Sequence, residues 1–190
     1  MNNIMIDIEA LDIKPTAAII SIAAAFFEPL TGEVGSALYL PVDVIDAQCQ
    51  GGTIGAGTIK WWMKQNQAAR DEITSNAGLP LSTALYRLND FCDSCDDLDN
   101  LKLWARGTDY DFPIIYQSMR LIGIRPLWSF WNVRDVRTVA EVALALRGHA
   151  SRRTVFEQSH HAMNDVINQI AKLSDDMKSI AASRVREGDL

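Results

Sequence analysis

The first strong pattern in the chain is an alternation of apolar and acidic positions close to its N-terminus. Residues 3–9 read Asn-Ile-Met-Ile-Asp-Ile-Glu. This order is typical of a buried β-strand, because successive side chains on a strand point to opposite faces. Ile6 and Ile8 then share one face, while Asp7 and Glu9 share the other. The pattern therefore predicts a strand that brings two carboxylates close together.

Further strands and then helices are predicted along the first half of the chain. Residues 18–28 and 36–42 are expected to be strands that form an antiparallel meander with the first, and Thr31-Gly32-Glu33 is expected to form the tight turn between them. Helical spacing predicts helices near residues 59–75 and 81–92. The glycine-rich segment 51–57 lacks the Gly-Lys-Ser/Thr of a phosphate-binding loop, so we expect a flexible loop there.

In the second half of the chain, strands and helices are expected to alternate. A short strand is expected at 101–105, a short segment near 131–133, and helices at 111–121, 136–146 and 162–184. Strands first, followed by this alternation, predict an α/β fold: a mixed central β-sheet of antiparallel meander plus parallel strands, flanked by helices. We expect a single domain over residues 1–190, with a flexible tail after about residue 184.

Composition indicates a globular protein of the cell interior. The chain has 190 residues and is 48% hydrophobic, which suffices for a sizeable core. No run of about 18 apolar residues occurs, and the most apolar stretch, 17–27, follows no basic leader. We therefore expect a cytoplasmic protein with no membrane contact. The three cysteines are expected to be reduced thiols, since Cys92 and Cys95 lack the second pair of a structural zinc site.

The net charge of −6 is distributed unevenly along the chain. Acidic proteins ordinarily bind polyanions poorly, because that affinity comes from lysine and arginine. Residues 106–153, however, contain eight arginines and four acidic residues, a net charge of +4, so the remainder carries −10. Arg147, Arg152 and Arg153, at the expected loop 148–156, are candidates for phosphate contacts. The alternative is that they are ordinary solvated arginines.

Two carboxylates on an apolar strand have a chemical consequence. Adjacent like charges repel, and a carboxylate removed from water without a partner costs several kcal/mol. Asp7 and Glu9 therefore favour cations between their oxygens, and hard divalent ions such as Mg²⁺ or Mn²⁺ fit oxygen ligands. The alternative is a strand whose polar face is simply solvated.

A third acidic residue follows the strand at 101–105. Because proline is tolerated in a first helical turn, Pro113 predicts that Asp111 lies at or near the N-cap of the next helix. Asp111 is thus either a plain cap or a third ligand. Asp109 is a competing candidate that we rank second.

The last acidic candidate is Asp165, early in the final helix. His160 precedes that helix and is expected on the loop before it, whereas His161, four residues before Asp165, would share its face. A histidine can take a proton from an attacking water, since its ordinary pKa is close to neutrality. The alternative for the two adjacent histidines is a solvated helix start.

These three segments, in this order, resemble the DEDD exonucleases of the DnaQ-like group in the ribonuclease H-like superfamily. The matching motifs are Asp7-Ile8-Glu9, the stretch Gly107 to Asp111 as Gly-x-x-Tyr/Phe-Asp, and His160 to Asp165 as His-x-x-x-x-Asp. The five-residue step of the third motif resembles the histidine subclass. Further segments, 14–22, 58–65 and 134–138, are similar to phage and prophage exonucleases related to the nuclease domain of exodeoxyribonuclease eight.

The resemblance implies a metal-dependent 3′-5′ exonuclease with a ribonuclease H-like sheet. Asp7, Glu9, Asp111 and Asp165 would hold two divalent ions, Mg²⁺ or Mn²⁺, about 4 Å apart, and His160 would be the general base. The partner would be the 3′ end of a nucleic acid, with DNA preferred over RNA.

Several alternatives stay open at this point. They are an exoribonuclease with the same site, a nucleic-acid-binding module that has lost catalysis, and a metal-dependent phosphatase acting on nucleotides. The oligomeric state is also open, a homo-oligomer included. Of the adjacent pair Trp61 and Trp62, at most one is expected to face the site and stack on a base, while the other packs in the core.

Overall fold

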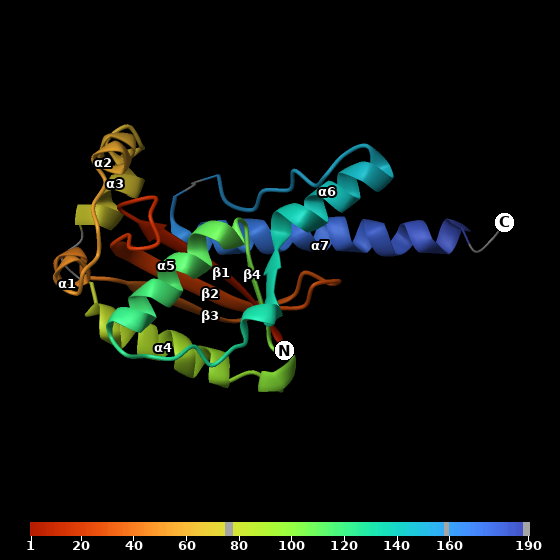
Figure 1. The fold of residues 1–190 in the computed structure, drawn as a ribbon. Helices are drawn as coiled ribbons and strands as arrows, with labels where there is room; N and C mark the ends of the chain where they lie inside the picture. The colour runs from red at the N-terminus through yellow and green to blue at the C-terminus, as the bar shows by residue number, and fades with distance from the viewer. Residues whose placement is uncertain (75–77, 158–159, 188–190) are drawn as a thin grey trace.

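A five-stranded sheet is the central layer of the computed structural model, which describes residues 1–74, 78–157 and 160–187 (Figure 1). The strand order is β3-β2-β1-β4-β5. Antiparallel pairing joins β1 to β2 and β2 to β3, and parallel pairing joins β1 to β4 and β4 to β5. The bounds are β1 Asn3–Ala10, β2 Ile19–Phe27, β3 Val34–Pro41, β4 Lys102–Ala105 and β5 Val133–Asp135. The predicted α/β fold with a mixed sheet is confirmed.

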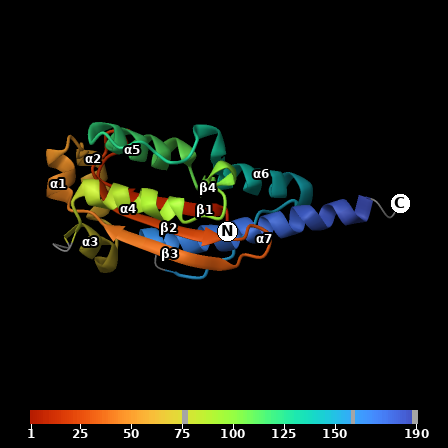
Figure 2. The ribbon, with the colours of Figure 1, turned by 90° about the horizontal axis from the view of Figure 1, so that it is seen from below.

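Helices cover both faces of this sheet. In Figures 1 and 2, α4 and α5 lie on one face and α7 crosses the other, with α6 beside it. Helix α7 is the longest and extends past the edge of the sheet. The helices are α1 Val44–Cys49, α2 Ala56–Trp62, α3 Gln67–Thr74, α4 Leu81–Asp93, α5 Thr108–Leu121, α6 Val136–Arg147 and α7 Ala162–Glu187, with 3-10 turns at Leu98–Asn100 and Phe130–Asn132.

The alternation along β1 divides the core into two parts, as the sequence predicts. Ile4, Ile6 and Ile8 belong to the larger cluster, which contains the buried residues of α4 and α5. Met5 belongs to the smaller cluster, which contains the buried stripe of α7. Because Asp7 has the same parity as Met5, it lies on the face that α7 covers.

Small residues on β2 allow α7 to lie close to this face. Ala23 is paired directly with Asp7, and Ala25 with Met5. Both alanines are completely buried in the cluster that contains Val166 and Ile170 of α7. A short side chain opposite Asp7 leaves room above the sheet, so the helix approaches while the carboxylate keeps space for its oxygens.

Three details of the helices differ from the sequence predictions. Helix α5 begins at Thr108, after Gly107 with a φ of 115°, and not at Asp111 as expected, so Asp111 lies in the first turn, near the N-cap. Pro113 consequently lies within the helix rather than at its start. The short helix α1 was not expected. A helix start that depends on a left-handed glycine gives no side-chain capping signal in the sequence.

The single helix expected at 59–75 is also wrong, because it is divided into α2 and α3. The chain turns between Trp62 and Gln67, and the Asn66 side chain accepts a hydrogen bond from the Ala69 N–H at 2.9 Å. Such a bond caps a new helix. The expected end of this helix, Ser75, lies outside the described residues. Of the tail expected after residue 184, residues 185–187 belong to α7 and residues 188–190 lie outside the described residues.

The structure also bears on two expectations drawn from composition, those on the cysteines and on membrane-spanning helices. All three cysteines are free thiols, and Cys92 is buried in the core. None of the described helices combines the length and the apolar character needed to cross a membrane.

Candidate metal and catalytic site

Two carboxylates of the site come from the end of β1. Asp7 and Glu9 project from the same face of the strand, and both line one hollow of about 400 Å³. The Asp7 Oδ1 accepts a hydrogen bond of 2.7 Å from the Nε2 of Gln169 on α7. The pairing of β1 with β2 shifts register between Glu9 and Ala10, so the strand is distorted where it enters the hollow.

Asp111 reaches the same hollow from the first turn of α5. Asp111 is only 4% exposed, and its Oδ1 accepts a hydrogen bond of 3.2 Å from the Ile8 N–H of β1. The pairing of β4 with β1 ends at Met5. Asp111 thus supplies the acceptor that β4 no longer provides, and this bond fixes the carboxylate beside the strand.

Asp109, the competing candidate, points elsewhere. Its side chain is 85% exposed and lies 3.6 Å from the Arg137 guanidinium. It is not among the residues that line the hollow. Of the two acids in this motif, the fold therefore brings only Asp111 to Asp7 and Glu9.

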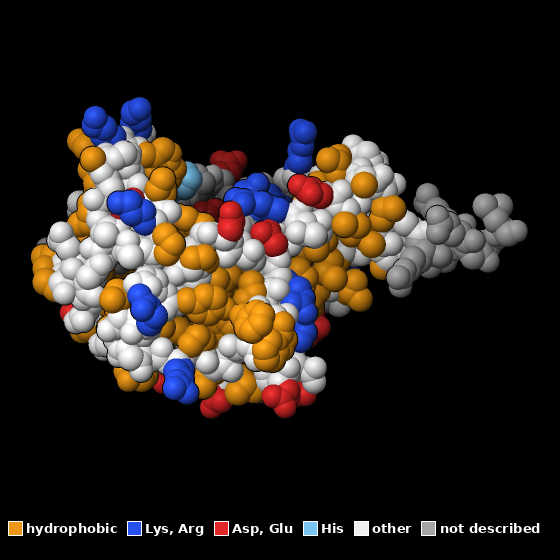
Figure 3. All heavy atoms as spheres, viewed as in Figure 1, with side chains coloured by type: hydrophobic (Ala, Val, Ile, Leu, Met, Phe, Trp, Pro, Cys, Tyr) orange, Lys and Arg blue, Asp and Glu red, His pale blue; other side chains and the backbone are white. Residues whose placement is uncertain are grey.

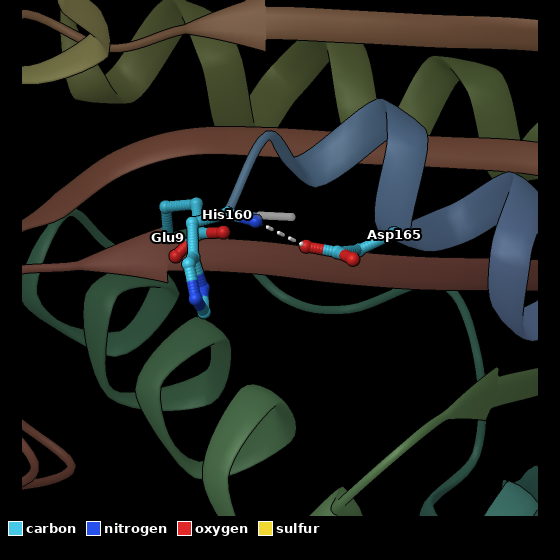
Figure 4. A group of neighbouring side chains, drawn as sticks. All are labelled: Glu9, His160 and Asp165. Carbon is cyan, nitrogen blue, oxygen red and sulfur yellow. Dashed lines mark hydrogen bonds between the residues drawn. The ribbon is translucent and has the colours of Figure 1, made fainter. Parts of the chain in front are cut away.

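The third segment closes the hollow from the side of α7. Asp165 lies in the first turn of α7, and its Oδ2 accepts a hydrogen bond of 2.9 Å from the His160 N–H (Figure 4). His160 precedes the helix, as expected, and has a φ of 62°, which is rare for a residue with a Cβ. One side-chain ligand atom each of Glu9, His160 and Asp165 lie within 4.8 Å of one another. A strained backbone held by such contacts is common at functional sites.

Two tryptophans hold the His160 ring. Its ring centroid lies 4.7 Å from that of Trp61 and 6.2 Å from that of Trp62, both edge to face. Trp62 is 2% exposed and donates its indole N–H to the Ala10 carbonyl at 3.2 Å, whereas Trp61 is 42% exposed. One indole packs in the core, as expected, and the other reaches the surface. Both nevertheless contact the His160 ring, whereas at most one was expected to face the site.

His161 takes a different direction from His160. Its ring stacks on Tyr39 at 4.9 Å between centroids, and its Nε2 lies 3.3 Å from Glu72. Tyr39 also donates a hydrogen bond to Glu72. These contacts anchor the start of α7 next to the residue that enters the site.

Burial raises the pKa of all four carboxylates, and repulsion by neighbouring acids of the site adds to this at Asp7 and Glu9. Removal from water is the largest cause in each case. Repulsion by neighbouring acids adds to it at Asp7, whose pKa lies well above its ordinary value, and at Glu9, whose pKa rises to about 8. The pKa of Asp111 rises to about 7, although its hydrogen bond from Ile8 opposes the shift. Among the described residues, none of the four forms an ion pair. This donor set fits hard divalent cations, which would balance the negative charge.

Sequence reasoning missed several other residues at the site. Arg106 and Lys172 place cationic side chains in the lining of the hollow, and Tyr110 also lines it. Gln169 could have been found from its spacing, because it lies four residues after Asp165 on the same helix.

A second, more apolar hollow of about 550 Å³ adjoins the first. The two share Glu9 and Tyr110 in their linings. Trp61 and Trp62 form part of its wall, together with Gly55 and Gly57 of the glycine-rich segment. This segment therefore borders the hollow that Glu9 also lines.

The three arginines proposed for phosphate contacts lie apart from the carboxylates. Arg147, Arg152 and Arg153 line another hollow, of about 580 Å³, between the loop after α6 and α7. Arg147 pairs with Asp176 at 2.8 Å, and Arg153 with Asp175 at 3.4 Å. Two of the three charges are thus partly balanced within the protein.

A family model and a curated relative that match this chain are both described as exonucleases. A family model described as the 3′-5′ exoribonuclease Rv2179c-like domain matches residues 2–176. The chain is similar to an exodeoxyribonuclease of Enterobacteria phage T4, with 29% identity over 170 residues that cover 77% of this chain and 74% of the relative.

Solved nuclease structures share the fold. The zinc-bound complex of E. coli exonuclease I with single-stranded DNA has a TM-score of 0.61 and 16% identity, over 90% of this chain and 39% of that one. Cell-death related nuclease 4 has a TM-score of 0.64 and 9% identity, over 93% of this chain and 64% of that one. The chain thus spans less than two thirds of each of these solved relatives, and at these identities the likeness concerns the fold.

Proposed function

Since the chain belongs to the family of the 3′-5′ exoribonuclease Rv2179c-like domain, a family of nucleases, we propose that it hydrolyses phosphodiester bonds at the 3′ end of a nucleic acid. The observation that carries this proposal is the convergence of four carboxylates and one imidazole, from three distant segments, on one hollow. Such a constellation supports phosphodiester hydrolysis assisted by two cations. The step of five residues from His160 to Asp165 supports the histidine subclass of these enzymes.

We assign the binding of two divalent cations, Mg²⁺ or Mn²⁺, to Asp7, Glu9, Asp111 and Asp165. The burial that raises the pKa of these carboxyl groups, and the absence of an ion pair to any of them among the described residues, support the assignment. When bound, such ions activate a water and stabilise charge on the departing oxygen. Gln169 orients Asp7, and the Ile8 N–H orients Asp111, so both carboxylates are held ready for their ligands.

His160 is the proposed general base. One of its ring nitrogens lies within 4.8 Å of oxygens of Glu9 and Asp165, a separation that leaves room for a water. The imidazole takes a proton from that water, the water oxygen bonds to phosphorus, and the bond from phosphorus to the 3′ oxygen breaks. The released 3′ oxygen takes up a proton from solvent. The products are a 5′-mononucleotide and a strand with a new 3′ hydroxyl group.

The apolar hollow next to Glu9 is suited to the terminal nucleotide. Trp61 is exposed on its wall, and an aromatic side chain that stacks on a base contributes about 1–3 kcal/mol. Because every base offers such a face, this contact suits a nuclease that removes nucleotides irrespective of sequence.

We propose DNA as the preferred substrate and RNA as the second candidate. The phage relative is named an exodeoxyribonuclease and is similar over most of this chain, which supports DNA. The family description names an exoribonuclease, which supports RNA. Side-by-side kcat/KM values for DNA and RNA oligonucleotides of one sequence decide between them.

The test of the activity is digestion of 5′-labelled and 3′-labelled oligonucleotides with Mg²⁺ or Mn²⁺. A 3′-5′ exonuclease shortens the 5′-labelled strand stepwise and releases the 3′ label as a mononucleotide at once. The variant Asp7→Asn should abolish both. Release of inorganic phosphate instead of mononucleotides would favour a phosphatase, and the absence of Mn²⁺ binding in calorimetry would favour a silent binding module.

A further inference from the structure

Four hollows on the surface form an unbroken series that passes over the carboxylates. The apolar hollow and the carboxylate hollow share Glu9 and Tyr110. The carboxylate hollow shares Arg106 and Lys172 with a third hollow of about 330 Å³. This third hollow shares Ala150 and Ser151 with the hollow that Arg147 and Arg152 line. The four therefore make one groove, with the carboxylates near one end of it.

One face of α7 forms the floor of this groove. Asp165, Asn168, Gln169 and Lys172 line its carboxylate part, Lys172 and Asp176 the middle part, and Asp175 and Ser179 the far part. Steps of three and four residues place these positions on one side of a helix. From Asp165 to Ser179 the helix rises by about 20 Å, at about 1.5 Å per residue. This is the length of the groove beyond the carboxylates.

The charge of the groove beyond the carboxylates is opposite to that of the protein as a whole. Its middle and far parts are lined by seven lysines and arginines and three acidic residues, whereas the whole chain has a net charge of −6. Arg106, Arg152 and Lys172 form no ion pair within the described ranges 1–74, 78–157 and 160–187. In Figure 3, lysine and arginine side chains gather at the centre of the upper edge of the molecule, beside a few acidic ones.

We propose that this groove, from Arg106 and Lys172 to Arg152 and Lys178, binds the 5′ continuation of a single nucleic acid strand whose 3′ end lies at the carboxylates. The proposal rests on the proposed function, because the carboxylates define where the 3′ end lies. A row of cations suits one chain of phosphates, and Arg106, Arg152 and Lys172 form no ion pair among the described residues. Non-specific single-strand grooves use such cations. At 3.4 Å per stacked nucleotide, about 20 Å holds about six nucleotides.

The experiment measures how strand length affects binding and hydrolysis. The substrates are single-stranded oligodeoxynucleotides of two to twelve nucleotides, labelled at the 5′ end. Their hydrolysis is measured in the presence of Mn²⁺. Their binding is measured by fluorescence anisotropy with proteins that also carry Asp7→Asn, so that no strand is cleaved. The test variant is Arg152→Gln with Lys178→Gln, at the far end of the groove. The matched control is Arg87→Gln with Arg120→Gln, two exposed arginines of α4 and α5 that do not line the groove.

The expected result is that kcat/KM rises with length up to about six nucleotides and then levels off. The test variant lowers the affinity for the octamer about tenfold and flattens the length dependence, while the control keeps both. If the test variant binds the octamer as tightly as the wild type, or if the control loses as much affinity as the test variant, the proposal that the groove binds the strand is wrong. If the test variant weakens binding but no oligonucleotide is cleaved by the wild type, the groove stands and the proposed activity fails.

Discussion

Replacing Glu9 with glutamine should stabilise the metal-free protein while it abolishes catalysis. In the folded protein the pKa of Glu9 is raised from 4.5 to about 8, mainly by burial and further by Asp165 and Asp111. The folded state therefore binds this proton more tightly than the unfolded chain. The stability that this proton contributes is fully present below about pH 4.5, and it is lost as the pH rises to about 8.

The size of the effect follows from the shift. One pKa unit corresponds to about 1.4 kcal/mol, so the loss above pH 8 is on the order of 4 to 5 kcal/mol for Glu9 alone. Glutamine has nearly the same shape and no charge, so Glu9→Gln should recover much of this amount. With Mn²⁺ the difference should shrink, because a ligand at about 100 times its Kd adds about 2.7 kcal/mol to the state that binds it.

The assay is urea denaturation with EDTA and with Mn²⁺, at pH 5 and pH 9. Glu33→Gln is the matched control, because Glu33 is exposed and forms no ion pair in the part of the chain that the structure describes. The free energies of unfolding of the wild type and Glu9→Gln should differ most in EDTA at pH 9 and least at pH 5. A Glu9→Gln protein no more stable than the wild type in EDTA at pH 9 would refute the reasoning.

Three further substitutions have defined outcomes. Asp111→Asn should lower kcat more than about 100-fold in oligonucleotide digestion, whereas the exposed Asp109→Asn should stay within about twofold; equal losses would contradict the ligand assignment. Trp62→Phe removes the donor to the Ala10 carbonyl and should lower the free energy of unfolding by about 1–3 kcal/mol in urea, an effect that an unchanged midpoint would exclude. Gly107→Ala requires a side chain at a φ of 115° and within 2.9 Å of the Arg137 guanidinium, so it should cost about 1–3 kcal/mol and reduce activity by displacing the start of α5. Wild-type activity and thermal midpoint in this variant would show that the helix start tolerates the change.

Residues with strong periodicity were predictable from the sequence. The two-residue repeat of β1 places Asp7 and Glu9 on one face whatever the surrounding fold, and the apolar repeat of α7 determines which side Asp165 occupies. His160 was expected on the loop before α7 and lies there. In each case the local geometry alone decides the outcome.

Features that depend on tertiary contacts were not predictable. The start of α5 depends on a left-handed Gly107. The sequence ranked Asp111 above Asp109, but the contact that separates them, the hydrogen bond from the Ile8 N–H to Asp111, comes from a distant strand. The partners of Arg147 and Arg153 are acidic residues more than twenty positions away. A sequence pattern records that these charges exist, but not which of them neutralise each other.

The continuous helix α7 has a consequence for how a strand would move. An unbroken helix keeps a constant separation between Asp165 and Ser179. The distance between the proposed phosphate-binding part of the groove and the point of cleavage therefore stays the same from one turnover to the next. After each mononucleotide leaves, the shortened strand must therefore advance by one step through contacts that are remade along its length. Ionic contacts to phosphates repeat identically at every nucleotide and permit this translocation, whereas contacts to particular bases would halt it at some sequences.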